Sequence, residues 1–301
     1  MPRLLPSSWF DALVIALHLA CYACCALAWD AGLWWIALLL WIPIAWGNHA
    51  ALTRLHEAVH GTLHPRSRTL NEVHGVAIGV ASLIPLNVYR YVHARHHAHL
   101  GNPRDPEFWP YSLPSAPRAQ RIVYAWTELL LGWPFTSLLY SVRTGLSWGE
   151  VPGRLRGRIV AEWALALVVW TTVPVLCARL GVLDLFLVAF VGPSWLTGVA
   201  QTLRKFVEHM GLHGETIADM TRTVVYERTP GRVASRSQMH VDHHAAHHRW
   251  ARIPFLDLPE ATARVYEGEH EAHVFPSHLS ALLDTLPHLL DPKLGPAWLT
   301  R

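Results

Sequence analysis

Charged residues are scarce in this sequence of 301 residues. Asp, Glu, Lys and Arg together make up 16%, against about 25% in soluble globular domains, whereas 51% of the residues are hydrophobic. The mean hydropathy of +0.20 is too high for an ordinary cytosolic enzyme and too low for a bundle buried entirely in lipid. The composition indicates a few membrane-spanning helices together with a sizeable polar part.

Cysteine is also rare, and Cys21, Cys24, Cys25 and Cys177 all fall within apolar runs. They are better explained as small buried hydrophobic residues than as a disulfide framework. Lys and Arg are scattered rather than clustered, so nothing indicates a nucleic acid partner. Repeats and linkers rich in Gly and Ser are missing, and we therefore expect one domain over residues 1–301.

Long apolar runs are present, and each is about the 20 residues that a helix needs to cross a hydrocarbon core of about 30 Å. They form two pairs with short connections, 9–28 with 34–53 and 159–178 with 185–203. A cleaved signal peptide is the alternative for the first run, but the run is too long and a second follows closely. We predict an all-α integral membrane protein with four transmembrane helices in two hairpins, about 9–53 and 159–203.

The basic residues predict the orientation of these hairpins. The short turns 29–33 and 179–184 hold one basic residue, Arg179, and the other 24 lie on the opposite side with both termini. The positive-inside rule makes that side cytoplasmic. Residues 54–158 and 204–301 should then form a cytoplasmic helical cap. Within it, the half-apolar segments 72–90 and 120–140, the latter interrupted by Pro134, are expected to be interfacial or re-entrant helices.

Histidine is abundant, and 15 of the 21 lie in two patches, between His56 and His99 and between His209 and His248. Such clustering points to metal. The first box is His56-Glu57-Ala58-Val59-His60. Residues i and i+4 share a face of a helix, so both imidazoles can reach one ion. The same string is the zinc protease motif H-E-x-x-H, and alone it is weakly specific.

Two triplets with H-x-x-H-H spacing follow. His93, His96 and His97 form one, trailed by Asp105-Pro106-Glu107, and His244, His247 and His248 form the other. His240 and His243 with His244 offer a competing triplet. His209, in Glu208-His209-Met210-Gly211, ends the fourth apolar run.

The number of histidines bears on the kind of site. Zinc sites take four ligands, and catalytic ones take three from the protein. Eight or nine boxed histidines are too many for one ion and suit two ions of higher coordination. Imidazole binds Fe, Zn, Cu and Ni alike, so the ligand type does not name the metal. With few carboxylates nearby, redox chemistry is favoured over hydrolysis.

The order H-x3-H, H-x2-H-H and H-x2-H-H, divided by a membrane hairpin, resembles the membrane fatty acid desaturase and hydroxylase superfamily. The resemblance runs from about His56 to Glu260. It includes Asp105-Pro106-Glu107, the Glu208-His209-Met210-Gly211 box and Ile253-Pro254-Phe255 with Leu258-Pro259 after the third box. The spacing to Ile253-Pro254 favours His244, His247 and His248 as the third box.

The resemblance implies two iron ions in the cytoplasmic cap, O2 as co-substrate and hydrogen abstraction from a lipid methylene. The implied iron ligands are His56, His60, His93, His96, His97, His209, His244, His247 and His248. Candidates for acceptors that orient these imidazoles are Glu57, Asp105, Glu107, Glu208 and Asp242. A haem motif of the His-Pro-Gly-Gly type is missing from the sequence, so electrons must come from a separate ferredoxin or b-type cytochrome.

Several alternatives remain open. A hydroxylase or ketolase of a carotenoid or another isoprenoid would carry nearly the same boxes. An intramembrane zinc protease built on His56, Glu57 and His60 would not need the triplets. A metal transporter or haem carrier would need polar residues inside the spans. Desaturation of a fatty acyl chain of a membrane lipid is the preferred interpretation, with its chain, head group and bond position open.

Overall fold

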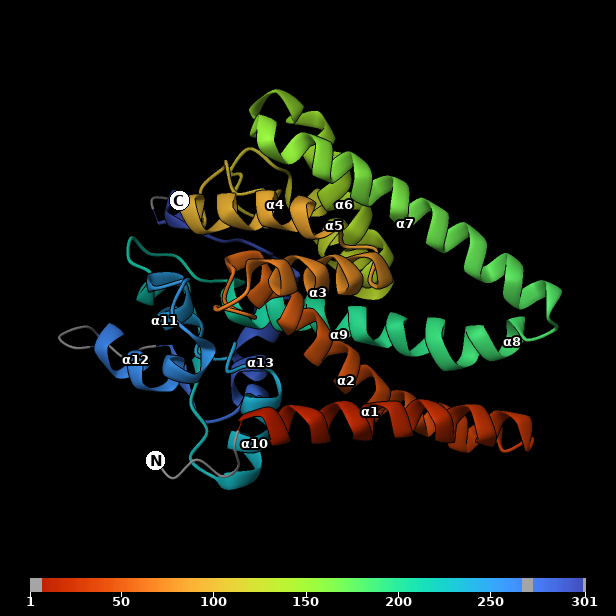
Figure 1. Ribbon diagram of the computed structural model, residues 1–301. Coiled ribbons are helices and arrows are strands. Elements are labelled where there is room, and N and C mark those ends of the chain that lie inside the picture. The colour runs from red at the N-terminus through yellow and green to blue at the C-terminus, as the bar shows by residue number, and fades with distance from the viewer. Residues whose placement is uncertain (1–6, 267–272, 300–301) are drawn as a thin grey trace.

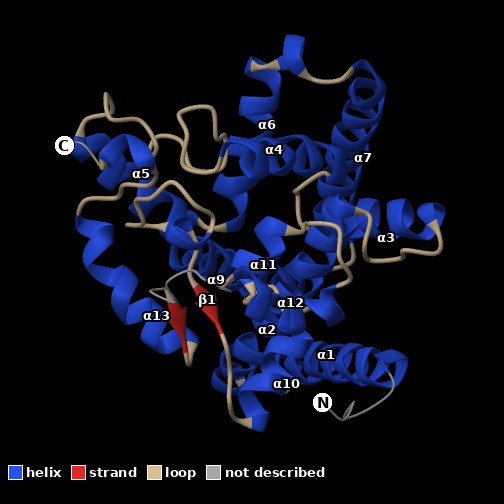
Figure 2. Ribbon diagram, turned by 90° about the vertical axis from the view of Figure 1, so that its left-hand side faces the viewer, coloured by secondary structure: helices blue, strands red, loops and turns tan. Residues whose placement is uncertain are grey.

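The protein is predominantly helical in the computed structural model, which describes residues 7–266 and 273–299 (Figure 1, Figure 2). The longer helices are α1 (Ser7–Asp30), α2 (Trp34–His60), α3 (Arg68–Ala81), α4 (Leu86–His99), α5 (Arg118–Leu131), α6 (Trp133–Leu146), α7 (Gly153–Arg179) and α9 (Gly192–His209). A four-residue helix, α8 (Leu183–Phe186), and a π-helical turn, η2 (Leu187–Val191), lead directly into α9.

The C-terminal part of the chain contains shorter elements. These are α10 (Thr229–Ser237), α11 (His244–Arg249), α12 (Leu258–Val265), α13 (His278–Thr285) and the 3-10 turns η1 (Trp148–Glu150), η3 (Ala218–Met220), η4 (Phe255–Asp257), η5 (Leu286–Leu290) and η6 (Pro296–Trp298). The all-α prediction needs one correction, because β1 (Thr223–Val224) and β2 (Val274–Phe275) pair in parallel. This pair joins the segment after α9 to the segment before α13.

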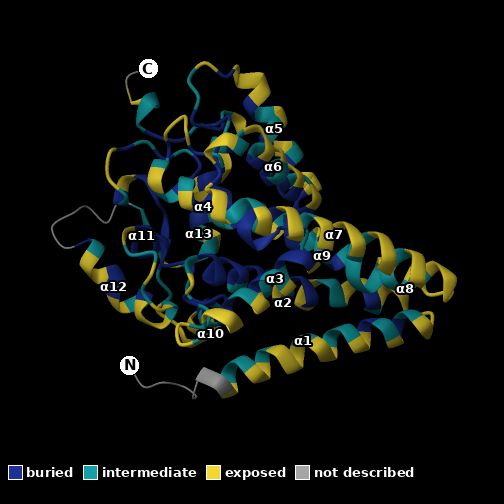
Figure 3. Cartoon of the chain, turned by 45° about the horizontal axis from the view of Figure 1, so that its top comes forward, coloured by how far each residue is buried: buried dark blue, intermediate teal, exposed yellow. Residues whose placement is uncertain are grey.

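Four helical segments are long and apolar enough to cross a membrane: Trp9–Asp30, Trp34–His60, Gly153–Arg179 and Leu183–His209. In the first and third, only 11% and 17% of the most apolar window is buried by the rest of the protein. Large apolar side chains such as Leu17 and Leu167 are exposed on them, as Figure 3 shows for the helices as a whole. Soluble proteins do not expose apolar surface on this scale. The chain is therefore a multi-pass membrane protein.

Short turns join the spans in sequence. Gly32 and Gly181 adopt φ values of 73° and 71°, which a residue without Cβ tolerates and which end the preceding helices. Both turns lie at the same end of the molecule, on the right of Figure 1, and α10 to α12 lie at the opposite end. Within the bilayer α1 packs on α2 through Cys25, Ala28, Ala37 and Ile44.

The third span, α7, packs mainly against α3 and α4. The indole of Trp170 donates to the Val80 carbonyl at 2.8 Å. The carboxylate of Glu162 is buried and accepts hydrogen bonds from the backbone and the side chain of Asn87. An acidic residue inside an apolar segment is thereby satisfied by a polar partner from α4.

The half-apolar segments are each divided in two. Residues 72–90, for which an interfacial or re-entrant helix is expected, fall within α3 and α4, which meet at a bend of 98° in the break that contains Pro85, a geometry compatible with a re-entrant segment. In the second segment, α5 ends at Leu131 and α6 begins at Trp133, with Pro134 in its first turn. Proline fits there because the first N–H groups of a helix have no intrahelical partner.

Helix α9 approaches the start of α6 closely at Gly198. A Cβ placed there would meet the backbone nitrogen and the side chain of Trp133. We predict that Gly198→Ala lowers the thermal midpoint in detergent by several degrees, since overpacking costs about 1–3 kcal/mol. Gly157→Ala in α7 is the control, because no described atom beyond the adjoining turns of α7 lies within 4 Å of a Cβ at that position. Equal midpoints of the two variants would contradict this close packing.

Candidate metal centre

Nine imidazoles from four helices converge at the end of the molecule opposite the two short turns. His56 and His60 lie in the last turns of α2, and His209 is the last residue of α9. The two triplets lie on α4 and α11. These are the nine residues named from the sequence as metal ligands, and the structure brings all of them together.

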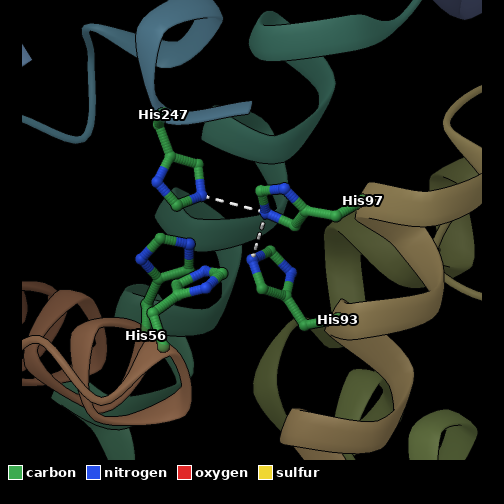
Figure 4. Close-up of side chains that lie close together, drawn as sticks. His56, His93, His97 and His247 are labelled. Carbon is green, nitrogen blue, oxygen red and sulfur yellow. Dashed lines mark hydrogen bonds between the residues drawn. The ribbon is translucent and has the colours of Figure 1, made fainter. Parts of the chain in front are cut away.

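Five of them form the first group, which we call cluster one. One ring nitrogen of each lies within 4.8 Å of the others. Figure 4 shows rings from α2, α4 and α11 turned toward one another. Nε2 of His97 is 3.0 Å from Nε2 of His93 and 3.0 Å from Nε2 of His247. The members are His56, His60, His93, His97 and His247.

The other four rings form cluster two: His96, His209, His244 and His248. Nε2 of His244 is 2.7 Å from Nε2 of His209 and 3.1 Å from Nε2 of His248. The ring of His96 lies 5.1 Å from that of His209 and 4.9 Å from that of His248, measured between centroids. The two clusters adjoin, because the rings of His97 and His248 stack at 4.3 Å.

The triplet spacing accounts for the division between clusters. Successive residues of a helix are rotated by about 100°, so residues i and i+4 point nearly the same way and residue i+3 is turned from residue i+4. His93 and His97 accordingly join cluster one while His96 reaches cluster two. On α11 the roles are reversed, since His244 and His248 join cluster two while His247 reaches cluster one. Each triplet thus contributes to both clusters.

The outward-facing nitrogens of several rings are anchored. Nδ1 of His93 lies 2.9 Å from the Glu107 carboxylate and Nδ1 of His96 lies 2.9 Å from that of Asp105. Nδ1 of His209 lies 2.9 Å from the carbonyl oxygen of Met220. Carboxylates and carbonyls accept hydrogen bonds, so these Nδ1 atoms carry the hydrogen and donate. The inward-facing Nε2 atoms therefore present lone pairs.

Hydrogen bonds between the rings cannot satisfy this arrangement. An imidazole nitrogen carries either one hydrogen or one lone pair. Nε2 of His97 and Nε2 of His244 each face two other Nε2 atoms, so each can bond to only one of them. The buried Nε2 of His60 has no hydrogen-bond partner among the residues that the structure describes.

A cation in each cluster would satisfy these lone pairs. Two nitrogens bound to one ion at about 2.1 Å and about 90° apart are separated by about 3.0 Å. The Nε2 separations within the clusters, 2.7 to 3.1 Å, fit this value. The donor set therefore fits two metal ions bound almost wholly by imidazole.

The protonation state of the rings also suits metal binding. Burial lowers the pKa of His244, His247 and His248 well below the ordinary range, and neighbouring imidazoles lower it further. These rings are neutral at pH 7, which is the form that binds metal. Burial raises the pKa of Glu107 to about 6. It remains mostly ionised at pH 7 and can accept from His93.

The other expected acceptors differ in how closely they approach the rings. Oε1 of Glu57 is 3.4 Å from Nδ1 of His56, and Glu57 also accepts from Thr62 at 2.7 Å. Oε1 of Glu208 is 3.5 Å from Nδ1 of His244 and pairs with Arg204. Asp242 differs from the prediction, since its carboxylate accepts from Ser235 at 2.8 Å and makes no hydrogen bond to any of the nine rings in the described chain.

Residues outside the boxes complete the surroundings. A cavity of about 20 Å³, room for about one water-sized molecule, borders both clusters and is lined by Tyr89, Tyr140, Gln201, Arg204 and Lys205 among others. Lys205 is buried and pairs with Glu128 of α5. Lys205 and Glu128 are charged residues within or next to apolar segments of the sequence, which indicates that they need a partner of opposite charge. Nothing in the sequence indicated that the Met220 carbonyl would anchor His209.

Comparison with known proteins gives one result. The family model described as fatty acid desaturase matches residues 33–278, which is most of the chain and includes all nine histidines. Comparison with curated protein sequences finds no match.

The anchoring of His96 by Asp105 can be tested by metal affinity. We predict that Asp105→Asn weakens metal binding about 10- to 100-fold, because such partners orient the ring and raise its basicity. The measurement is retention of metal against a competing chelator, with helical content followed by circular dichroism. Asp257→Asn, at an exposed position, is the control. Equal retention in both variants would show that the contact has no part in metal binding.

Proposed function

This chain belongs to the fatty acid desaturase family, and we propose that it uses a histidine-bound pair of iron ions and O2 to desaturate a fatty acyl chain of a membrane lipid. The observation that carries the proposal is the pair of adjoining imidazole clusters with converging Nε2 lone pairs. Family membership indicates an oxidoreductase, and the clusters indicate metal binding.

The chain's own residues would hold the metals in the following way. One iron would be bound by cluster one and the other by cluster two, nine imidazoles in all. Glu107 and Asp105 would hold the rings of His93 and His96, and the Met220 carbonyl would hold that of His209. When bound, two iron ions would supply the redox chemistry with O2 that removes hydrogen from an unactivated methylene.

A second cavity supports a lipid substrate. It measures about 130 Å³, and its lining is largely apolar, including Leu52, Ile78, Phe190 and Trp133. Leu52 lies one turn before His56 on α2, and Thr197, also in the lining, lies one turn before Gln201 of the smaller cavity on α9. Both helices thus lead from this cavity to the metal clusters. We propose that an acyl chain enters here from the bilayer, with position relative to the irons selecting the methylene.

We further propose that the four spans form two hairpins and that the histidine clusters lie in a cytoplasmic cap. The support is the distribution of basic residues, of which only Arg179 lies in the two short turns. Residues 1–6 and 300–301 lie outside the described residues, and the cytoplasmic placement of the termini rests on the same rule. A separate ferredoxin or b-type cytochrome would deliver electrons on that side.

The two alternatives to desaturation differ in whether the structure bears on them. Hydroxylation or ketolation of a carotenoid or another isoprenoid uses the same metal centre, and the product distinguishes it. The zinc protease alternative requires Glu57 to act as a general base on an open face of the ion. Glu57 is instead buried and occupied by Thr62. The zinc protease alternative also leaves the seven clustered histidines outside the H-E-x-x-H motif without a role.

The reaction can be tested by expressing the protein in a host with defined lipids and analysing total lipids by mass spectrometry. We predict a new unsaturated acyl species with the wild type and its loss with His96→Ala, which removes a member of cluster two. His64→Ala is the control, since His64 is outside both clusters and its ring hydrogen-bonds to His74. New oxygenated carotenoids without new double bonds in acyl chains would contradict desaturation and support the carotenoid or isoprenoid alternative.

The orientation can be tested by labelling single cysteines after the four native cysteines are changed to alanine. Asp30 lies at the first short turn and Glu260 on α12, and both are exposed. We predict that a membrane-impermeant thiol reagent labels Asp30→Cys in intact cells and labels Glu260→Cys only after lysis. The reverse pattern would place the histidine clusters on the outer side.

A further inference from the structure

A third group of potential metal ligands lies just before α11. One ligand atom each from His240, Asp242 and His243 lies within 4.8 Å of the others. These residues include the competing histidines of the third box, and they are not members of either cluster. Their hydrogen bonds determine which of their atoms remain free.

The hydrogen bond of His240 fixes its tautomer. Ser235 Oγ lies 2.8 Å from Oδ1 of Asp242 and 2.7 Å from Nδ1 of His240. The hydroxyl has one hydrogen, and the carboxylate can only accept, so the hydroxyl donates to Asp242. Nδ1 of His240 then carries a hydrogen and donates to Ser235. The Nε2 atom of His240 is left with a lone pair that no described residue donates to.

His243 is held in the same way on the other side. Thr262 Oγ1 donates to the carbonyl of Leu258 at 2.9 Å and lies 2.7 Å from Nδ1 of His243. Since the threonine hydrogen is used, Nδ1 of His243 donates to Thr262. Its Nε2 atom likewise keeps a lone pair. Metal-binding histidines have this arrangement, with the other nitrogen held by a polar partner.

Asp242 supplies the third free atom. Its side chain is buried, and Oδ2 has no hydrogen-bond partner in the described part of the chain. The guanidinium of Arg236 pairs with Asp11 at 3.7 Å and stacks over the rings of Phe10 and Phe255. A buried carboxylate oxygen without a partner is unfavourable and calls for a cation.

We propose that His240, Asp242 and His243 bind a third metal ion, a zinc ion, and that the free Nε2 atoms of the two histidines and Oδ2 of Asp242 turn toward it. Two histidines and a carboxylate form an established zinc donor set, with water in the fourth position. This proposal rests on atoms that the nine-histidine centre does not use, and it stands independently of the proposed function.

The ion would act on the third histidine box through the backbone. His243 directly precedes α11, and Met239 and His240 have φ values of 56° and 52°, which are uncommon for residues other than glycine. Zinc would lock this loop and thereby fix the start of the helix that carries His244, His247 and His248. Its role is structural, at a distance from the reacting atoms.

The test is metal analysis of the purified full-length protein by mass spectrometry after iron loading and incubation with one equivalent of Zn²⁺. We expect two iron ions and one zinc ion per chain in the wild type. Asp242→Asn and His240→Gln should lose the zinc and keep the iron. His96→Ala should lose iron and keep the zinc, and His64→Gln should match the wild type.

Two results would overturn the proposal. The first is the finding that the wild-type protein holds two iron ions and takes up no zinc. This result needs no variant. The other is a zinc content of the Asp242→Asn and His240→Gln proteins equal to that of the wild type. Size-exclusion profiles and thermal midpoints establish that these variants are folded.

Discussion

The structure depends on one electrostatic constraint: nine largely buried imidazoles direct lone pairs at one another. The Nε2 atoms of His97 and His244 each face two other Nε2 atoms at 2.7 to 3.1 Å. Each of these atoms can form a hydrogen bond with only one of its two neighbours. Anchors on the opposite nitrogens, such as Asp105 and Glu107, hold the rings in these orientations. Cations among the lone pairs would satisfy such a preorganised set, and metal binding is therefore the explanation that fits the arrangement.

The membrane part of the fold serves the same centre. Helix α2 crosses the bilayer and ends in His60, and the span Leu183–His209, of which α9 is the last part, crosses it and ends in His209. Both line the apolar cavity before they reach the clusters. The α1 and α7 spans are exposed over most of their surface and cover the outside. A lipid would therefore meet the metal centre along two helices that span the membrane and carry ligands.

Much of this could be predicted from the sequence. Apolar length located the four spans, and triplet spacing located the convergent histidines, because both depend on helical geometry within one segment. The role of the nine residues as ligands remains a prediction. The bend between α3 and α4 is compatible with the re-entrant segment expected at 72–90, but the position of the break has no signal, since the apolar pattern continues through it. Contacts made across loops had no signal in the helical pattern, as with Met220 beside His209 and Ser235 beside Asp242.

The most direct test of the metal centre is crystallographic anomalous scattering from the iron-loaded protein, with data collected on both sides of the iron absorption edge. The account predicts two iron peaks, one bounded by His56, His60, His93, His97 and His247 and the other by His96, His209, His244 and His248. A single peak, or a zinc ion held by His56 and His60 with the other rings unbound, would contradict it.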